Sequence, residues 1–189
     1  MTTHVLVLSD IFGLCAGLER LLADLNQAGA AVQFIDPYQG QIQHFADEAQ
    51  AYAAYSRECG HETYAAIAAQ VFANSKQPFD LAIGFSAGAT ALWRALANTD
   101  TRLLKQAILF YPGQIYQHLA LTPAVPTQVI FGHSEPHFAV TDICSQLQQK
   151  PGVTAVSTDY AHGFMNPASQ AFDEAGYQQQ LSKLLKRLV

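Results

Sequence analysis

The chain has 189 residues, of which half are hydrophobic and 13% are charged, and its formal net charge is −5 at neutral pH. This length predicts one domain, residues 1–189, with a sizeable buried core. The acidic balance argues against a nucleic-acid partner. No apolar run reaches the roughly 18 residues that cross a bilayer, and the first residues lack the basic region of a signal peptide, so we expect a cytoplasmic protein without a membrane partner.

Short apolar runs alternate along the chain with longer stretches rich in alanine, leucine and glutamine. The short runs are continuously apolar, as is typical of strands that are covered on both faces. The predicted strands are His4–Leu8, Ala31–Ile35, Leu81–Gly84, Gln106–Phe110, Gln128–Phe131 and Thr154–Thr158. The predicted helices are Leu14–Ala28, Ala46–Arg57, Glu62–Ser75, Ala87–Asn98, Thr141–Gln149 and Gln170–Leu188. The alternation predicts an α/β fold with about six mostly parallel strands and helices on both faces.

Residues that can do chemistry follow the predicted strands at the points where the strands end. Ser9 and Asp10 follow the first strand, Ser86 the third, Glu135 the fifth and His162 the sixth. In a doubly wound sheet these carboxyl ends meet at one edge, where ligands bind. The sequence therefore predicts an active site at that edge. The segment 111–126 is rich in proline and leaves little room for a full crossover helix.

The pentapeptide Gly84-Phe85-Ser86-Ala87-Gly88 stands between an apolar run and a helical stretch. A sharp turn from strand to helix with serine at its apex lifts the hydroxyl clear of the sheet as a nucleophile. Glycines are needed on both sides because neither the turn nor the close approach of strand and helix leaves room for a side chain. Ser86 is accordingly the predicted nucleophile.

A serine hydroxyl needs an adjacent base that is itself held by an acid. His162 follows the last predicted strand and Glu135 the one before it, which gives the order nucleophile, acid, base found in α/β-hydrolases. Two backbone N–H groups should stabilise the oxyanion, and we expect them from Ile11 and Ala87. Two other carboxylates compete less well with Glu135 for the role of the acid. Asp142 falls in the following helix, and Asp159 is too close to His162 in sequence to reach back easily.

These motifs, in order, make the chain resemble the dienelactone hydrolase family of α/β-hydrolases. The resemblance is carried by Ser9-Asp10-Ile11-Phe12-Gly13-Leu14, Asp36-Pro37-Tyr38, the serine pentapeptide, Gly-x-x-Glu-Pro ending at Pro136, and His162-Gly163-Phe164. It implies a compact α/β-hydrolase fold without a large lid, and hydrolysis of carboxylic esters or lactones through an acyl-enzyme without a metal or other cofactor.

The chain departs from the family pattern at three positions. It has Ser86 where the best-known members have cysteine, Glu135 where the usual acid is aspartate, and Asp10 where glutamate is frequent. Asp10 together with Phe12 and Tyr111 is a candidate for the pocket, although an aspartate at such a place is more often part of an Asx turn.

Other chemistries have weaker support in the sequence. The pattern His133-x-Glu135-x-His137 has neither helical spacing nor a fourth ligand, and the three cysteines show no CxxC pair, so no metal site is predicted. No G-x-G-x-x-G motif follows the first strand, which disfavours a dinucleotide binder. The sequence predicts a serine hydrolase acting on a small ester, lactone or thioester; the alternative is a degenerate hydrolase fold that only binds a ligand or partner. Substrate identity and oligomeric state stay open.

Overall fold

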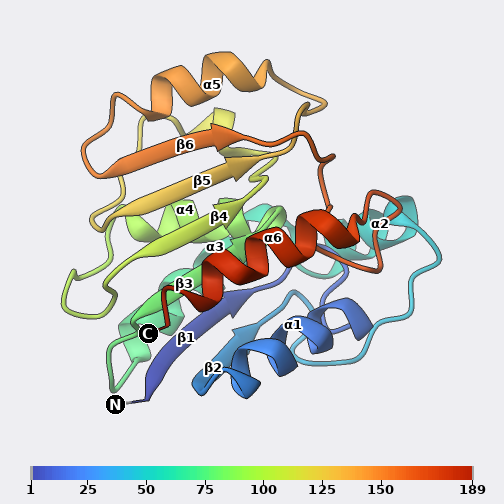
Figure 1. The fold of residues 1–189 in the computed structure, drawn as a ribbon, viewed down its shortest axis with the longest axis horizontal. Helices are drawn as coiled ribbons and strands as arrows, with labels where there is room; N and C mark the ends of the chain where they lie inside the picture. The colour runs from blue at the N-terminus through green and yellow to red at the C-terminus, as the bar shows by residue number, and fades with distance from the viewer. Residues whose placement is uncertain (1, 189) are drawn as a thin grey trace.

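The computed structural model describes residues 2–188, and these contain one six-stranded sheet in which neighbouring strands all run parallel, in the order β2-β1-β3-β4-β5-β6 (Figure 1). The strands are β1 (Thr3–Leu8), β2 (Ala30–Ile35), β3 (Leu81–Phe85), β4 (Ala107–Phe110), β5 (Thr127–Phe131) and β6 (Val153–Ser157). The helices are α1 (Ala16–Gln27), α2 (Glu48–Glu58), α3 (Gly60–Asn74), α4 (Ala87–Leu96), α5 (Val140–Leu147) and α6 (Glu174–Leu185). This arrangement confirms the predicted α/β-hydrolase fold class.

Each predicted strand is found, with ends that differ by at most one residue. The last helix is shorter than predicted, because the residues from 170 to 173 are held by other contacts. The Gln170 N–H donates to the Glu48 carboxylate (2.7 Å), and the Asp173 side chain caps α6 by accepting from the Gly176 N–H (2.8 Å). Within the irregular segment after β4, a short 3₁₀ helix η1 (Ile115–His118) forms, which the sequence did not predict.

The side chains of β1 alternate between two hydrophobic clusters, one on each face of the sheet. Val5 and Val7 pack in the cluster that contains residues of α1 and α6, whereas Leu6 and Leu8 pack in the cluster that contains residues of α3, α4 and α5. Burial on both faces is the reason why the strand sequences are continuously apolar. The apolar runs seen in the sequence are therefore explained by the two helical layers.

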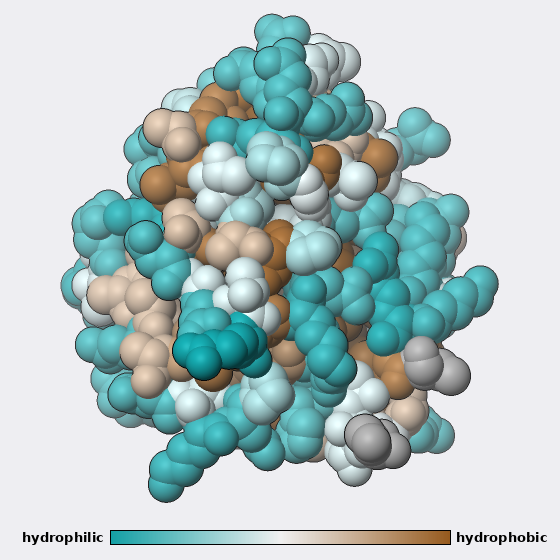
Figure 2. All heavy atoms as spheres, turned by 90° about the vertical axis from the view of Figure 1, so that its left-hand side faces the viewer, coloured by the Kyte–Doolittle hydropathy of each residue, from teal (hydrophilic) through white to brown (hydrophobic). Residues whose placement is uncertain are grey.

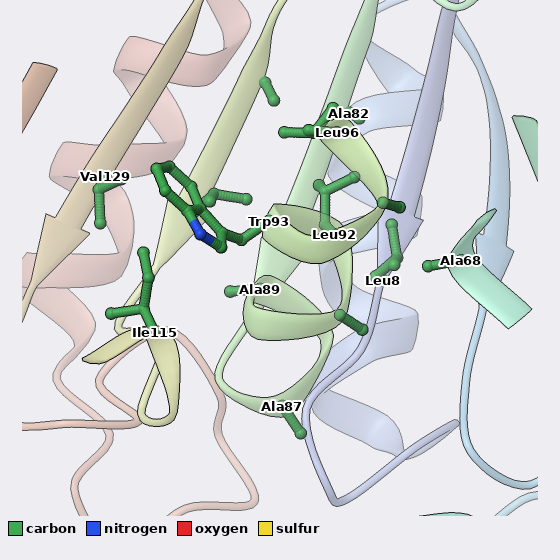
Figure 3. Packing of buried hydrophobic residues seen from close by; sticks show 14 of the residues in the cluster. Leu8, Ala68, Ala82, Ala87, Ala89, Leu92, Trp93, Leu96, Ile115 and Val129 are labelled. Carbon is green, nitrogen blue, oxygen red and sulfur yellow. The ribbon is translucent and has the colours of Figure 1, made fainter. Parts of the chain in front are cut away.

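Helix α4 lies at the centre of the second cluster, and its residues are almost all buried. Figure 3 shows Leu92, Trp93 and Leu96 of α4 among side chains from neighbouring elements, with Ile115 of η1 close by. The Trp93 indole N–H also donates to the carbonyl oxygen of His118 (3.0 Å), so that η1 is held against α4. The helix that follows Ser86 is thus a fixed part of the core.

The glycines of the pentapeptide allow α4 to approach the sheet. A Cβ on Gly84 would lie 2.7 Å from the Cα of Ala89, and one on Gly88 would lie 2.7 Å from the Leu8 carbonyl oxygen and closer still to that of Ser9. Both contacts are too short for real atoms, and both involve backbone that cannot swing aside. The two glycines are therefore required by packing of α4 on β1 and β3.

A Gly88→Ala substitution should lower the free energy of unfolding by at least about 2 kcal/mol, because the new methyl group overpacks backbone of β1. Urea denaturation followed by circular dichroism measures this loss. The matched control is Gly113→Ala, whose Cβ would meet nothing nearer than 3.4 Å and should cost about 1 kcal/mol or less. Equal stability of Gly88→Ala and the unsubstituted chain would contradict the close approach.

The carboxyl ends of the strands, and with them the candidate site, lie on the side opposite the one shown in Figure 2. That figure shows the edge where the strands begin, where hydrophilic side chains predominate and hydrophobic ones lie between them. Among residues 2–188, no helix combines the length and the apolar character needed to cross a bilayer.

Candidate active site

Ser86 is the single residue between β3 and α4, and its backbone has the positive φ of 49° with ψ of −110°. L-amino acids with side chains rarely adopt this conformation, which turns the chain sharply. The turn is held on both sides: the Ser86 N–H donates to the Phe110 carbonyl oxygen (2.9 Å), and the Ser86 carbonyl oxygen accepts from the Thr90 N–H (3.0 Å). The hydroxyl is thereby placed at the carboxyl edge of the sheet.

Three side chains that are far apart in sequence meet at this edge. Ser86 Oγ lies 2.9 Å from His162 Nε2, and His162 Nδ1 lies 2.7 Å from Glu135 Oε2. Because the carboxylate only accepts, His162 carries its proton on Nδ1, and its Nε2 accepts from the Ser86 hydroxyl. The Glu135 side chain is fully buried, whereas that of His162 is about one-third exposed. The three groups thus form a continuous hydrogen-bonded series.

The loops that carry Glu135 and His162 are bound to each other. The His133 N–H donates to the Tyr160 carbonyl oxygen (2.7 Å), and His133 Nδ1 donates to the same oxygen (2.9 Å). On its other side, the His162 ring packs against Tyr111, with 4.8 Å between ring centroids. These contacts fix the orientation of the imidazole.

The two expected oxyanion donors border the same cavity as Ser86. Within the described residues, neither the Ile11 N–H nor the Ala87 N–H has a hydrogen-bond acceptor. The loop of Ile11 is fixed on both sides: the Tyr38 hydroxyl donates to the Ile11 carbonyl oxygen (2.7 Å), and Asp10 Oδ1 accepts from the Phe12 N–H (2.9 Å). Both residues thus border the cavity with no internal acceptor for their N–H groups among the described residues, and the loop of Ile11 is held in position.

A cavity of about 330 Å³ opens beside Ser86. One wall comes from α2 and α3, a region that no pattern in the sequence linked to the site. The rest of the lining comes from Ser86 and the start of α4 and from the loops that follow β1, β4, β5 and β6. The lining residues are Ile11, Glu48, Tyr52, His61, Ser86, Ala87, Thr90, Gly113, Gln114, Glu135, Pro136, His137 and His162.

Three residues expected to line the pocket lie behind it instead. Asp10, Phe12 and Tyr111 are buried and do not border the cavity. Asp10 accepts from Asn166 Nδ2 through Oδ2 (2.8 Å), so it ties the loop that contains Ile11 to the loop that contains His162. Asn166 was not among the residues predicted from the sequence. The only signal for it was its position four residues after His162. Asp10 thus acts in the structure as an Asx-turn residue and a link between loops.

Burial raises the pKa of Asp10, and this outweighs the hydrogen bonds from Asn166 and Phe12 that lower it. A carboxyl group with a raised pKa in the folded state destabilises the fold as pH rises from the unfolded-state value through the folded-state value. An Asp10→Asn chain should therefore gain stability relative to the unsubstituted chain between pH 4 and pH 8. Urea denaturation of both chains across this range measures the difference, in which titrating groups that do not interact with Asp10 cancel. A constant difference would contradict the raised pKa.

Within residues 2–188, no group of three His, Cys, Asp or Glu side chains is placed to hold a metal ion. The side chains of the pattern around Glu135 have other partners: His133 donates to Tyr160, and Glu135 accepts from His162.

A model of the dienelactone hydrolase family matches residues 2–188. The uncharacterised protein YczH of Bacillus subtilis is 25% identical over 183 residues, covering 94% of this chain and 88% of that protein. Among solved structures, a dienelactone hydrolase-like promiscuous phosphotriesterase, P91, has a TM-score of 0.67 at 16% identity, covering 98% of this chain and 86% of its own. The thioesterase domain from the curacin biosynthetic pathway gives 0.66 at 14% identity, covering 97% and 91%. The dienelactone hydrolase from Anabaena variabilis gives 0.64 at 15% identity, covering 99% and 85%.

Proposed function

This chain belongs to the dienelactone hydrolase family, and from that premise and the geometry of its site we propose that it is a serine hydrolase. Its substrate is a small carboxylic ester, lactone or thioester. Ser86 is the nucleophile, His162 the general base and acid, and Glu135 the acid that orients His162. The observation that carries the proposal is the hydrogen-bonded series from Ser86 Oγ through His162 to Glu135, with distances of 2.9 and 2.7 Å.

In the first half of the reaction, the Ser86 oxygen attacks the carbonyl carbon while its proton passes to His162 Nε2. The carbonyl oxygen becomes an oxyanion, which accepts from the Ile11 and Ala87 N–H groups. Each such donor is worth roughly 3 kcal/mol of transition-state stabilisation. Glu135 stabilises the imidazolium, because its buried carboxylate accepts from Nδ1–H.

The tetrahedral intermediate then collapses and the bond to the leaving group breaks. His162 gives its proton to the leaving oxygen or sulfur, which departs as an alcohol or a thiol, and the acyl group stays on Ser86. In the second half, His162 takes a proton from water, whose oxygen attacks the acyl carbon. The acid leaves, and the proton returns from His162 to the Ser86 oxygen.

The proposal is tested with a series of p-nitrophenyl esters of short to medium acyl chains, together with a fluorophosphonate probe and intact-mass analysis. We expect turnover and a single label on Ser86. Folded protein that neither turns over any ester nor takes the label would favour the alternative, a degenerate hydrolase fold that binds without chemistry. Matched oxoester and thioester substrates of one acyl group then separate esterase from thioesterase activity.

A further inference from the structure

The cavity beside Ser86 is bordered by a carboxylate that the proposed reaction does not use, that of Glu48 at the start of α2. This carboxylate is fixed through one oxygen: Glu48 Oε1 accepts from the Ser169 hydroxyl (2.8 Å) and from the Gln170 N–H (2.7 Å). Its Oε2 has no hydrogen-bond partner among the described residues, and it is not one of their buried unpaired atoms, so it is open to solvent. A residue that borders the cavity thus carries a fixed carboxylate with one oxygen free.

No positive side chain neutralises Glu48, because the ion pairs among the described residues involve other carboxylates. The cavity lining contains a second carboxylate, that of Glu135, and neither lysine nor arginine. Arg94 reaches the His61 carbonyl oxygen (3.4 Å) from outside the lining, but its guanidinium pairs with both carboxylate oxygens of Glu62 (2.9 and 2.7 Å). Apart from its histidines, the ionisable groups of the lining are therefore negative.

Two further sources of charge beside the cavity do not reverse this sign. The N-terminus of α2 carries about half a positive charge, but two carboxylates stand there, Glu48 and the N-cap Asp47, which accepts from the Gln50 N–H (2.8 Å). Histidines add little positive charge at about pH 8, where imidazole in water is neutral. Burial, followed by the charge of Arg94, also lowers the pKa of His61 in the lining. The cavity is thus a site of negative charge.

One charge acts on another across several ångströms of a partly enclosed site, so the effect needs neither direct contact nor a particular orientation. We propose that the cavity selects esters by charge and that Glu48 is the specificity residue. An ester with a distal alkylammonium group is preferred over an uncharged ester of the same shape, and both are preferred over an ester with a distal anion. This inference rests on the proposed ester hydrolysis and adds the class of substrate to it.

Three p-nitrophenyl esters of the same shape test the inference. Each is an ester of butanoic acid, and its far end carries a trimethylammonium, a tert-butyl or a sulfonate group, which are all tetrahedral and differ in charge. At about pH 8 and low ionic strength, we expect kcat/KM for the ammonium ester to exceed that for the sulfonate ester by about tenfold or more, with the tert-butyl ester between them. Spontaneous hydrolysis of each ester is subtracted.

Substitution of Glu48 tests the residue itself, with the ratio of kcat/KM for the ammonium ester to that for the sulfonate ester as the readout. Glu48→Gln removes the charge but keeps an oxygen that can accept from Ser169 and Gln170, and it should lower this ratio by about threefold or more. The matched control is Glu19→Gln, which removes the same unit of net charge from an exposed position on α1 outside the cavity lining. It should leave the ratio unchanged.

Salt gives a second readout, which a role of Glu48 in folding alone would not move. Raising the ionic strength from about 0.02 M to about 0.5 M shortens the Debye length below the dimensions of the site and should bring the ratio towards one. In the Glu48→Gln chain the ratio should depend less on salt than in the unsubstituted chain. Circular dichroism establishes that each variant is folded before its kinetics are compared.

The outcomes separate this inference from the proposed function. If the three esters are hydrolysed but the sulfonate ester is as good a substrate as the ammonium ester, selection by charge is wrong and the hydrolase proposal stands. The same holds if Glu48→Gln leaves the ratio unchanged or if Glu19→Gln lowers it as much, because the charge at Glu48 then has no particular part in selection. If folded protein hydrolyses none of the esters, the proposed function fails and this inference fails with it.

Discussion

Replacement of Ser86 by alanine should reduce kcat for ester hydrolysis by about 10⁴-fold or more, because the attacking oxygen is removed and only binding and the oxyanion donors remain. The Ser86 hydroxyl lies 2.9 Å from His162 Nε2, within reach for proton transfer at the moment of attack. The alanine chain should keep its fold, since Ser86 has a Cβ already and its turn is held by backbone hydrogen bonds to Phe110 and Thr90. Labelling by the fluorophosphonate should disappear together with the turnover.

The matched control is Ser182→Ala, which removes an exposed hydroxyl on α6 and should leave both turnover and labelling as they are. Residual turnover above one-hundredth of the original in the Ser86→Ala chain would mean that another group attacks the ester. A label that moves to a different residue would lead to the same conclusion. Loss of turnover with retained labelling is not expected, because both reactions need the same oxygen.

Replacement of Glu135 by glutamine should lower kcat by about 10³- to 10⁴-fold, with little change in KM. The carboxylate is buried and hydrogen-bonds through Oε2 to His162, while Oε1 has no partner within the described residues. A neutral amide in this place neither favours the proton on Nδ1 nor stabilises the imidazolium that forms during attack. The base then loses the tautomer and the charge stabilisation on which proton transfer depends.

Two further substitutions give this prediction its controls. Glu135→Asp restores the charge with a side chain one methylene shorter, and it should recover part of the lost kcat. Glu174→Gln removes an exposed carboxylate that pairs with Arg20, and it should leave kcat unchanged. If Glu135→Gln stays within tenfold of the original kcat while the fold is intact, another group orients His162.

The sequence predicts the strands well because their pattern is local. Each strand is a continuous apolar run, and burial on both faces demands that composition wherever a parallel sheet is covered by helices. The turn at Ser86 can be predicted because its requirements are also local. Close contacts to Ala89, Leu8 and Ser9 require glycine at positions 84 and 88, and these glycines can be recognised directly in the sequence. The order of Ser86, Glu135 and His162 adds a signal that does not depend on distance.

The wall of the cavity formed by α2 and α3 could not be predicted, because its residues form no recognisable sequence motif. Glu48, Tyr52 and His61 stand on ordinary amphipathic helices, and only the way α2 and α3 pack brings them towards Ser86. The long-range contact of the Asp10 side chain could likewise not be predicted from the sequence. The sequence favours an Asx turn at Asp10 over a place in the pocket, but it holds no sign of the contact with Asn166, which spans 156 residues. Such long-range contacts are set by tertiary packing.

The positive φ of Ser86 sets selection for activity against selection for stability. A serine at φ of 49° costs of order 1–3 kcal/mol relative to an unstrained residue, and only glycine would adopt this conformation with little penalty. Relaxing the turn in that way would delete the hydroxyl, so evolution towards a more heat-resistant chain must find its gains elsewhere in the protein. The residue proposed to do the chemistry is thus a place where the chain is not at its stability optimum.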